Sequence, residues 1–254
     1  MRFFKFIFIS LFFIIFSDSF GQEILLSDTL LYEKKILLRK EKSGFLMVHT
    51  QGFGIGYRSG KHKTGYKKRM FEVELTGMMH SKEVKVINPY FENAKSYVYG
   101  KENSFLLIRA GMGIQKIINS KPYWGGVELK YFYYGGISLG LLKPVYLYIL
   151  NETNIDYEYN LTTEKYDPNK HFTDNIYGRA SFFKGLGKIK PLPGLYLKAG
   201  LNFDYGANDR SIKAIEAGAT FDIYPKPVPI MAFNQNSYYF LSLYVSFSLG
   251  VRGY

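Results

Sequence analysis

The sequence predicts an all-β protein, an antiparallel transmembrane β-barrel with eight strands and a filled lumen. The 254-residue chain carries 23 Tyr, 22 Phe and 25 Gly, a combination that favours strands. Its apolar run near the N-terminus is shorter than the roughly 20 residues that a spanning helix needs. The remainder alternates apolar and polar residues in segments of about ten, as strands that cross a membrane do.

The N-terminus has the layout of a secretory signal peptide. Arg2 and Lys5 supply positive charge, residues 6–16 form an apolar run, and Ser19 and Gly21 are the small residues before the cleavage point. We therefore expect export to the outer membrane of a Gram-negative bacterium through a cleaved signal peptide. The expected division is signal peptide 1–21, N-terminal periplasmic segment 22–42 and outer-membrane β-barrel 43–254.

Eight segments carry the period-two alternation that predicts strands. In one of them Leu195, Leu197 and Leu201 fall on one face, while Lys198 and Asp204 fall on the other. An even number of strands agrees with bacterial single-chain barrels. The expected strands lie near residues 44–58, 68–82, 103–117, 123–142, 175–184, 193–206, 211–224 and 238–252.

The first expected strand is irregular, because His49 and Gln51 share the parity of its apolar residues. A bulge near Gly52, or a strand end beyond the lipid, would explain this.

The fourth expected strand contains Gly135-Gly136, which has the composition of a hairpin turn. The two faces nevertheless stay in phase through these glycines, which favours one continuous strand. The alternative is a barrel of ten strands, with residues 35–39 as an extra strand and a hairpin at the two glycines.

The polar faces of the predicted strands carry charges of both signs. Eight strands enclose a lumen that side chains just fill, and a lone buried charge is far less favourable there than a paired one. We therefore expect a structural salt-bridge network in the lumen. Its predicted members are Glu72, Glu74, Arg109, Glu128, Lys130, Arg179, Lys198, Asp204, Glu216 and Asp222.

A second charged cluster is basic and lies around a predicted turn. It is either a solvated turn or a contact with the phosphates of lipopolysaccharide. The residues of this predicted lipopolysaccharide contact are Arg58, Lys61, Lys63, Lys67, Lys68 and Arg69. The net charge of +12 does not indicate nucleic acid, because the protein is expected to be exported.

The sequence predicts no catalytic, cofactor-binding or metal-binding residues. It contains no Cys, and it lacks the phosphate-binding GxxxxGK[ST] motif as well as HExxH and GxSxG. The acidic segment 151–174 lacks the glycine-turned loop of a calcium site, so a solvated loop is expected. Four histidines are scattered without a third residue to orient them. They are His49, His62, His80 and His171.

A family resemblance is carried by four segments and by the predicted cleavage point. They are residues 99–101, 124–128, 136–147, 224–233 and Gly21-Gln22. They resemble those of a family of outer-membrane β-barrel proteins from Bacteroidota-type bacteria. The resemblance covers most of the mature chain and implies location and fold, but it transfers no catalytic residue. Tyr254 is the expected terminal aromatic residue, although the apolar alternation ends at Val251, out of step with it.

The function expected from these features is non-enzymatic. A narrow filled barrel offers surfaces and loops, which suits a structural or accessory component of an outer-membrane assembly or secretion complex. The alternatives are a small barrel enzyme acting on lipid A or peptides, and a small pore. The expected partners are outer-membrane lipids, lipopolysaccharide, and a periplasmic or outer-membrane protein, with no nucleic acid and no cofactor.

The expected strand count also predicts sidedness. With both termini in the periplasm, the basic turn 59–67 is extracellular and the connections 83–102 and 143–174 are periplasmic. The segment 83–102 is too aromatic for a free linker, so it is expected to dock on the inner mouth of the barrel or on a periplasmic partner. A ten-strand barrel would invert this arrangement.

Overall fold

A computed structural model describes residues 40–91, 94–121, 126–152, 159–206 and 210–253. The predicted signal peptide 1–21 and residues 22–39 of the next segment lie outside the described residues, and so do Trp124 and Tyr254. No helix in the described part of the chain is long and apolar enough to cross a membrane.

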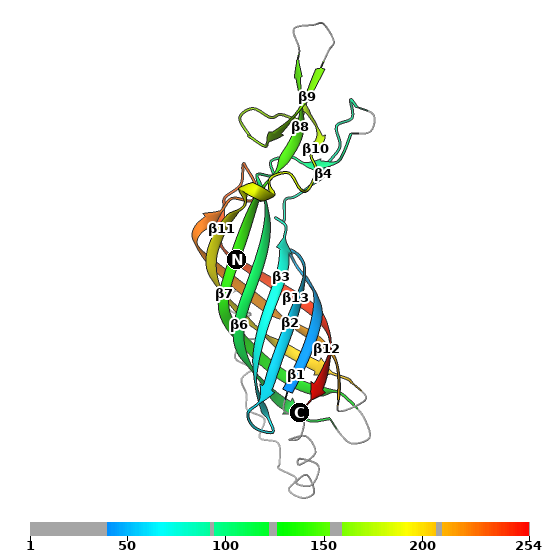
Figure 1. Cartoon of the computed structure of the whole chain (residues 1–254), viewed down its shortest axis with the longest axis vertical. Helices are drawn as coiled ribbons and strands as arrows, with labels where there is room; N and C mark the ends of the chain where they lie inside the picture. Colours follow the sequence, from blue (N-terminus) through cyan, green and yellow to red (C-terminus); the bar gives the residue numbers. More distant parts are fainter. Residues whose placement is uncertain (1–39, 92–93, 122–125, 153–158, 207–209, 254) are drawn as a thin grey trace, which may run out of the picture. The chain divides into compact units, whose positions relative to one another are not determined.

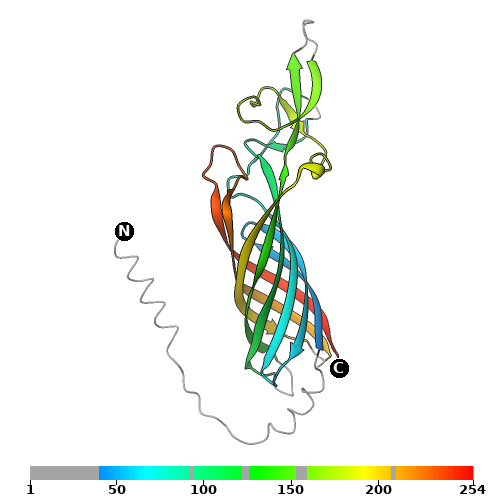
Figure 2. The ribbon, with the colours of Figure 1, turned by 60° about the vertical axis from the view of Figure 1, so that its left-hand side comes forward.

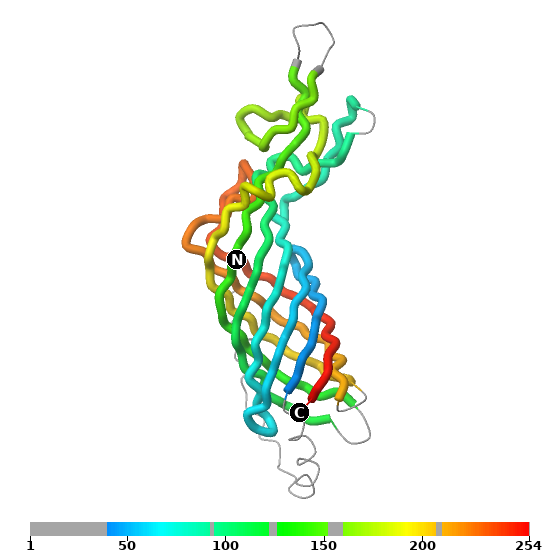
Figure 3. The backbone as a smooth tube through the Cα atoms, viewed as in Figure 1, coloured from blue at the N-terminus to red at the C-terminus, as the bar shows by residue number. Residues whose placement is uncertain are grey.

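Eight antiparallel strands form a closed barrel (Figures 1 and 3), which confirms the predicted fold class and strand number. The barrel closes where β1 pairs with β13, from Lys40 opposite Gly253 to His49 opposite Tyr244. The strands are β1 (Lys40–His49), β2 (Gly52–His62), β3 (Lys67–Met78), β6 (Asn103–Asn119), β7 (Glu128–Pro144), β11 (Lys190–Asp204), β12 (Ser211–Val228) and β13 (Ser237–Gly253).

Two of the eight predicted strands are wrong, and the errors offset each other in the count. The segment 44–58 is not one strand, because the chain turns at residues 50–51 and returns as β2. Gly52 follows this turn with a φ of 152°, and a Cβ there would lie 2.2 Å from the Gly77 carbonyl oxygen. The alternation of apolar and polar residues breaks at His49 and Gln51 because the chain makes a tight turn there. We expected a bulge or a strand end at this point.

The second error concerns residues 175–184, which were expected in the barrel. Only Ile176–Arg179 (β10) is a strand there, and it pairs with β8 (Tyr146–Glu152) outside the barrel wall. β8 also pairs with β9 (Tyr159–Lys165), which gives a separate sheet in the order β10-β8-β9.

The continuous strand through Gly135 and Gly136 is confirmed, so the hairpin of the ten-strand alternative is wrong. Gly136 lies opposite Gly111 of β6, and a Cβ on Gly136 would approach the Ala110 carbonyl oxygen to 2.2 Å. Gly111 and Gly136 therefore allow β6 and β7 to lie close together, and the strand continues without a turn.

The two ends of the barrel differ in their connections. The end where β1 begins and β13 ends, called the terminal end, carries the connections 63–66, 120–127 and 205–210. The opposite end, called the cap end, carries the connections 50–51, 79–102, 145–189 and 229–236.

The predicted placement of these connections relative to the chain ends is therefore wrong. The basic turn lies at the terminal end together with the described chain ends, and the long connections lie at the opposite end. The reason is the hairpin at residues 50–51, which moves the connections from 63–66 to 145–189 to the other end. Because residues 175–184 add no strand to the barrel, the later connections 205–210 and 229–236 lie at the ends where they were expected.

The long connections fold against each other at the cap end (Figure 2). We call the sheet β10-β8-β9 and the segment 84–99 that packs on it the cap. This segment holds β4 (Lys85–Val86) paired with β5 (Tyr97–Val98). Tyr97 shares one buried cluster with Leu147, Ile149 and Ile176 of the sheet. The segment 83–102 was expected on the inner mouth of the barrel or on a partner, and its residue Tyr97 instead packs on the sheet β10-β8-β9 of the same chain.

The cap continues into the barrel mouth through backbone hydrogen bonds. The Ala232 amide donates to the Gly100 carbonyl oxygen at 2.7 Å, and the Glu102 amide donates to that of Ile230 at 3.0 Å. Below these bonds an apolar cluster fills the mouth at the cap end. Its buried members are Met78, Phe105, Leu107, Leu142, Tyr224, Val228, Ile230, Met231 and Phe240.

Candidate functional site: the charged lumen and the outer wall

Arg58 is the centre of a buried ion-pair network in the lumen. Its guanidinium binds both Glu72 of β3 and Glu216 of β12, with Nε donating to Glu72 at 2.8 Å and Nη2 to Glu216 at 3.0 Å. Asn202 also donates to Glu216, at 2.6 Å. The three charged side chains are at most 3% exposed, so each charge depends on these partners.

Two further cations extend this network toward the cap end. The Lys198 ammonium donates to Glu72 at 2.9 Å and also binds Glu74. Arg109 donates to both carboxylate oxygens of Asp222, at 2.9 and 2.6 Å, and to Glu74 at 3.2 Å. The bidentate pair of Arg109 with Asp222 joins β6 to β12 across the lumen.

A second ion-pair group occupies the terminal end of the lumen. Lys130 lies 2.8 Å from Glu128 and 2.9 Å from Asp204. Arg252 donates to Glu41 at 2.8 Å and also binds Asp204. Lys68 binds the same Glu41 carboxylate.

Aromatic rings occupy the space between the lumen charges. The Arg58 guanidinium lies 4.9 Å from the Phe45 ring centre and 5.1 Å from that of Tyr134. Lys198 lies 4.8 Å from the ring centre of Tyr244. These distances are in the range of cation–π attraction. The lumen is therefore filled by ion pairs and rings together.

The structure brings nine of the ten predicted network residues into the lumen. Arg179 is the exception, because it lies on β10 in the cap, where its side chain is exposed. Arg58 and Lys68 belong to the lumen and cannot contact lipopolysaccharide, since each is only 2% exposed. The sequence interpretation also missed Glu41 and Arg252. If the first strand is ended before residues 50–51, Glu41 falls on the same inward-facing side of β1 as Phe45.

The outer wall of the barrel is apolar on all eight strands. Leu46, Phe53 and Leu243 are more than 60% exposed, and the outward positions between them continue the same composition. Soluble monomers rarely expose apolar patches above a few hundred Å². A band that runs around a whole barrel therefore needs a lipid environment.

Charge on the outer wall is confined to its ends. Seven exposed cations lie near the terminal end, six of them on the adjacent strands β1, β2, β3 and β6 and one on β12, and we call them the cation belt. On the described barrel strands no Asp or Glu faces outward. The belt consists of Lys40, Lys42, Lys61, Lys67, Arg69, Lys116 and Lys213. Of the predicted lipopolysaccharide contact, Lys61, Lys67 and Arg69 belong to the belt, and Lys63 is exposed in the adjoining turn.

His171 is buried in the cap beside a carboxylate. His171 lies 3.3 Å from Glu164 in the cap, and its Nδ1 accepts the Asp167 amide at 3.0 Å. Hydrogen bonds from Thr162 and Asn151 lower the pKa of the Glu164 carboxyl. In the described part of the chain, no group of three or more His, Asp or Glu side chains could hold a metal ion. The pair links β9 to the connection that follows it.

Comparisons with known proteins identify similar structures but no sequence family. No family model matches the sequence, and no curated protein sequence matches it. Among solved structures, Neisserial surface protein A is similar with a TM-score of 0.41 at 9% identity, covering 84% of this chain and 95% of that one. Ail of Yersinia pestis, with bound sucrose octasulfate, gives 0.39 at 8% identity, with 84% and 96% covered.

A third similar structure is the N-terminal β-barrel domain of Pseudomonas aeruginosa OprF. Its TM-score is 0.34 at 10% identity, with 83% of this chain and 97% of that one covered. At such values the assignment of the fold rests on the strand pairing of this chain itself.

Proposed function

We propose that this protein is a non-enzymatic outer-membrane β-barrel whose lumen is sealed and whose cap binds a protein partner. In this role it is a structural or accessory component of an outer-membrane complex. The observation that carries the proposal is a folded cap with exposed apolar side chains on a barrel that is closed inside. Val84, Ile87 and Tyr90 are 67%, 62% and 78% exposed on the cap, away from the apolar wall.

The lengths of the connections support an orientation with the cap outside the cell. Barrels of this kind have short periplasmic turns and long extracellular loops. The connections at the terminal end are short, and the long ones form the cap. We therefore place the terminal end in the periplasm and the cap at the cell surface.

Conduction is disfavoured by the contents of the lumen. The ion pairs of Arg58, Lys198 and Arg109 fill its middle, and an apolar cluster fills the mouth at the cap end. We expect no stable single-channel steps from the wild-type protein in planar bilayers. Such steps would contradict a sealed lumen.

The orientation is tested with single cysteines, because the chain has none of its own. Thr173 is exposed in the cap and Thr64 is exposed in the short turn at the terminal end. An impermeant thiol reagent added to whole cells should label Thr173→Cys and spare Thr64→Cys, and cell lysis should expose both. The reverse pattern would place the cap in the periplasm.

The partner is tested by pull-down of the tagged full-length protein from native membranes in mild detergent. We expect a protein that is retained by the wild type and lost by the variant Val84→Ser, Ile87→Ser, Tyr90→Ser. Leu161→Ser is the control, because Leu161 is 46% exposed on β9, at the opposite edge of the cap sheet from β10. Retention by the triple variant, or loss by the control, would contradict the assigned surface.

A further inference from the structure

The cation belt contains like charges that face each other directly. Lys40 lies opposite Lys61, Lys61 lies opposite Arg69, and Lys67 lies opposite Lys116. Like charges at directly paired strand positions repel and destabilise a sheet. None of these side chains forms an ion pair with a carboxylate of the described residues. An external anion bound to this belt would reduce the repulsion.

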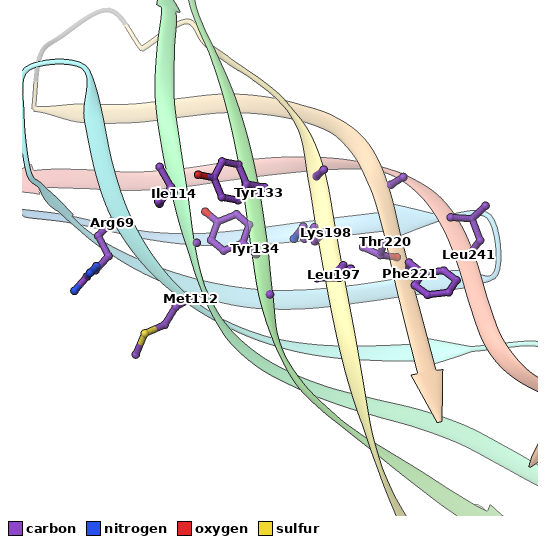
Figure 4. A pocket seen from close by; sticks show the side chains of 14 residues that line it. Arg69, Met112, Ile114, Tyr133, Tyr134, Leu197, Lys198, Thr220, Phe221 and Leu241 are labelled. Carbon is purple, nitrogen blue, oxygen red and sulfur yellow. The ribbon is translucent and has the colours of Figure 1, made fainter. Parts of the chain in front are cut away.

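A groove on the outer wall begins at one member of this belt. Figure 4 shows Arg69 at one side of the groove and Leu241 at the other. The groove has a volume of about 780 Å³. Its floor is low because Gly135, Ala199 and Ala219 carry little or no side chain on the outward face.

Bulky side chains form the walls of this groove. Met112 and Tyr133 lie on β6 and β7, and Phe221 lies on β12. Strand pairing places Ala199 beside both Tyr133 and Ala219, so the low floor continues across β11 and β12. The lining also includes Lys198 and Thr220, which are only 2% exposed. Arg69, paired with Ile114, is therefore the charged side chain on the outward face of the groove.

We propose that this groove is a binding site for an anionic glycerophospholipid. An acyl chain lies over Gly135, Ala199 and Ala219, and the headgroup phosphate binds Arg69 together with the neighbouring Lys61. The guanidinium can bind two phosphate oxygens at once, and Lys61 adds a second positive charge. The apolar length of the groove excludes a free phosphate ion as the main ligand.

The identity of the lipid follows from the orientation, so this inference rests on the proposed function. With the terminal end in the periplasm, the belt meets the inner leaflet, where the lipids are phospholipids. The absence of outward carboxylates on the described strands favours an anionic headgroup over a zwitterionic one. We commit to phosphatidylglycerol, and lipid A is an alternative outcome of the test.

The test uses the mature full-length protein in mild non-ionic detergent, with native mass spectrometry to count bound lipids. Phosphatidylglycerol, phosphatidylethanolamine and lipid A are titrated separately. We expect phosphatidylglycerol to bind at least about tenfold more tightly than phosphatidylethanolamine. Arg69→Ala should weaken phosphatidylglycerol binding about fivefold, the effect of one cation near a lipid phosphate.

Two further variants distinguish the contribution of the lipid headgroup to binding from that of the acyl chain. Ala199→Phe fills the groove without changing charge, so it should weaken phosphatidylglycerol and phosphatidylethanolamine by the same factor. Lys143→Ala removes a cation from the cap end of the wall and should leave binding unchanged. Each variant is first checked for a folded barrel by heat-modifiable migration on gels.

Three results would overturn the proposal: equal binding by Arg69→Ala and Lys143→Ala, no effect of Ala199→Phe, or tighter binding of lipid A than of phosphatidylglycerol. This assay in detergent is independent of membrane sidedness. A failure of the lipid site is therefore distinguishable from a failure of the orientation, which thiol labelling at Thr64 and Thr173 reports.

Discussion

The inner and outer faces of the barrel wall are formed by alternate residues of the same strands, yet they differ in their charged residues. All seven carboxylates on the described barrel strands face inward, where six cations pair with them. The outer face carries cations alone, and only near its ends. The comparison shows that a buried charge requires a partner from the protein itself, whereas an outward cation requires only water or a lipid phosphate.

The largest expected effect comes from removing one inward cation. Arg58→Met leaves Glu72 and Glu216 without their shared partner, so we expect the free energy of unfolding to fall by about 3–5 kcal/mol. The matched control is Arg69→Met, an outward position on the neighbouring strand, with an expected change within about 0.5 kcal/mol. Urea titrations in vesicles of phosphatidylcholine, which lack the anionic headgroup proposed to bind Arg69, measure both through the gel shift between folded and unfolded forms.

A compensating change sharpens the first result. Glu216→Gln removes one of the two carboxylates that Arg58→Met would strand, so the double variant should recover part of the lost stability. Equal losses in Arg58→Met and Arg69→Met would mean that the two faces do not differ as we describe.

The second prediction inserts a cation on the outer face. Ala217 faces outward on β12 within the apolar band, and Ala217→Arg should lower the free energy of unfolding by about 2–4 kcal/mol if the position is near the membrane midplane. Lys213→Arg, on the same face of β12 but within the cation belt, should leave stability unchanged. The same urea titration applies, and a tolerated arginine at 217 would argue against a lipid-facing band.

The sequence predicts the two faces better than it predicts the connections. Alternation correctly assigned Leu197 outward and Lys198 inward, because a one-residue shift would reverse every side chain of the strand. The tight turn after His49 was missed, since it breaks the alternation by one step and resembles a bulge. Arg58 was consequently placed in a surface cluster.

The cap could not be predicted from alternation at all. Residues 176–182 alternate as a barrel strand does, but only Ile176–Arg179 is a strand, and its partner is β8. Alternation of apolar and polar residues predicts a half-buried strand, but it does not predict the sheet to which that strand belongs. The pairing of Tyr97 with Leu147 and Ile176 in one buried cluster depends on contacts between two connections far apart in the chain.

The third prediction concerns glycines on the two faces of the wall. A Cβ on the inward Gly111 would lie 2.4 Å from the Tyr196 hydroxyl oxygen, so Gly111→Ala should cost about 1–3 kcal/mol through overpacking. A Cβ on the outward Gly135 would lie 3.4 Å from Leu197, so Gly135→Ala should change stability by less than about 1 kcal/mol. Adding Tyr196→Phe to Gly111→Ala should restore part of the loss. No rescue would mean that the clash lies elsewhere, for example with the Gly135 carbonyl oxygen.

The smallest expected effect is in the cap, where a carboxylate is paired but not buried. The Glu164 side chain is 42% exposed and lies 3.3 Å from His171, while the Thr162 hydroxyl donates to it at 2.9 Å. These hydrogen bonds lower the pKa of Glu164 in the folded protein. Its contribution to stability is therefore complete above the ordinary glutamate pKa of about 4.3 and is lost as the pH falls through the lower folded value.

Because the lumen carboxylates also titrate, the contribution of Glu164 is seen as a difference between variants. Glu164→Gln should remove less than about 1 kcal/mol at pH 7, and its difference from the wild type should become smaller as the pH falls through the lowered pKa of Glu164. Asp174→Asn is the control, since it removes one negative charge from an exposed site in the same connection. Near-ultraviolet circular dichroism during urea unfolding at pH 7, 5, 4 and 3 measures the differences. A difference that grows on acidification would show that the charged form of Glu164 does not stabilise the cap.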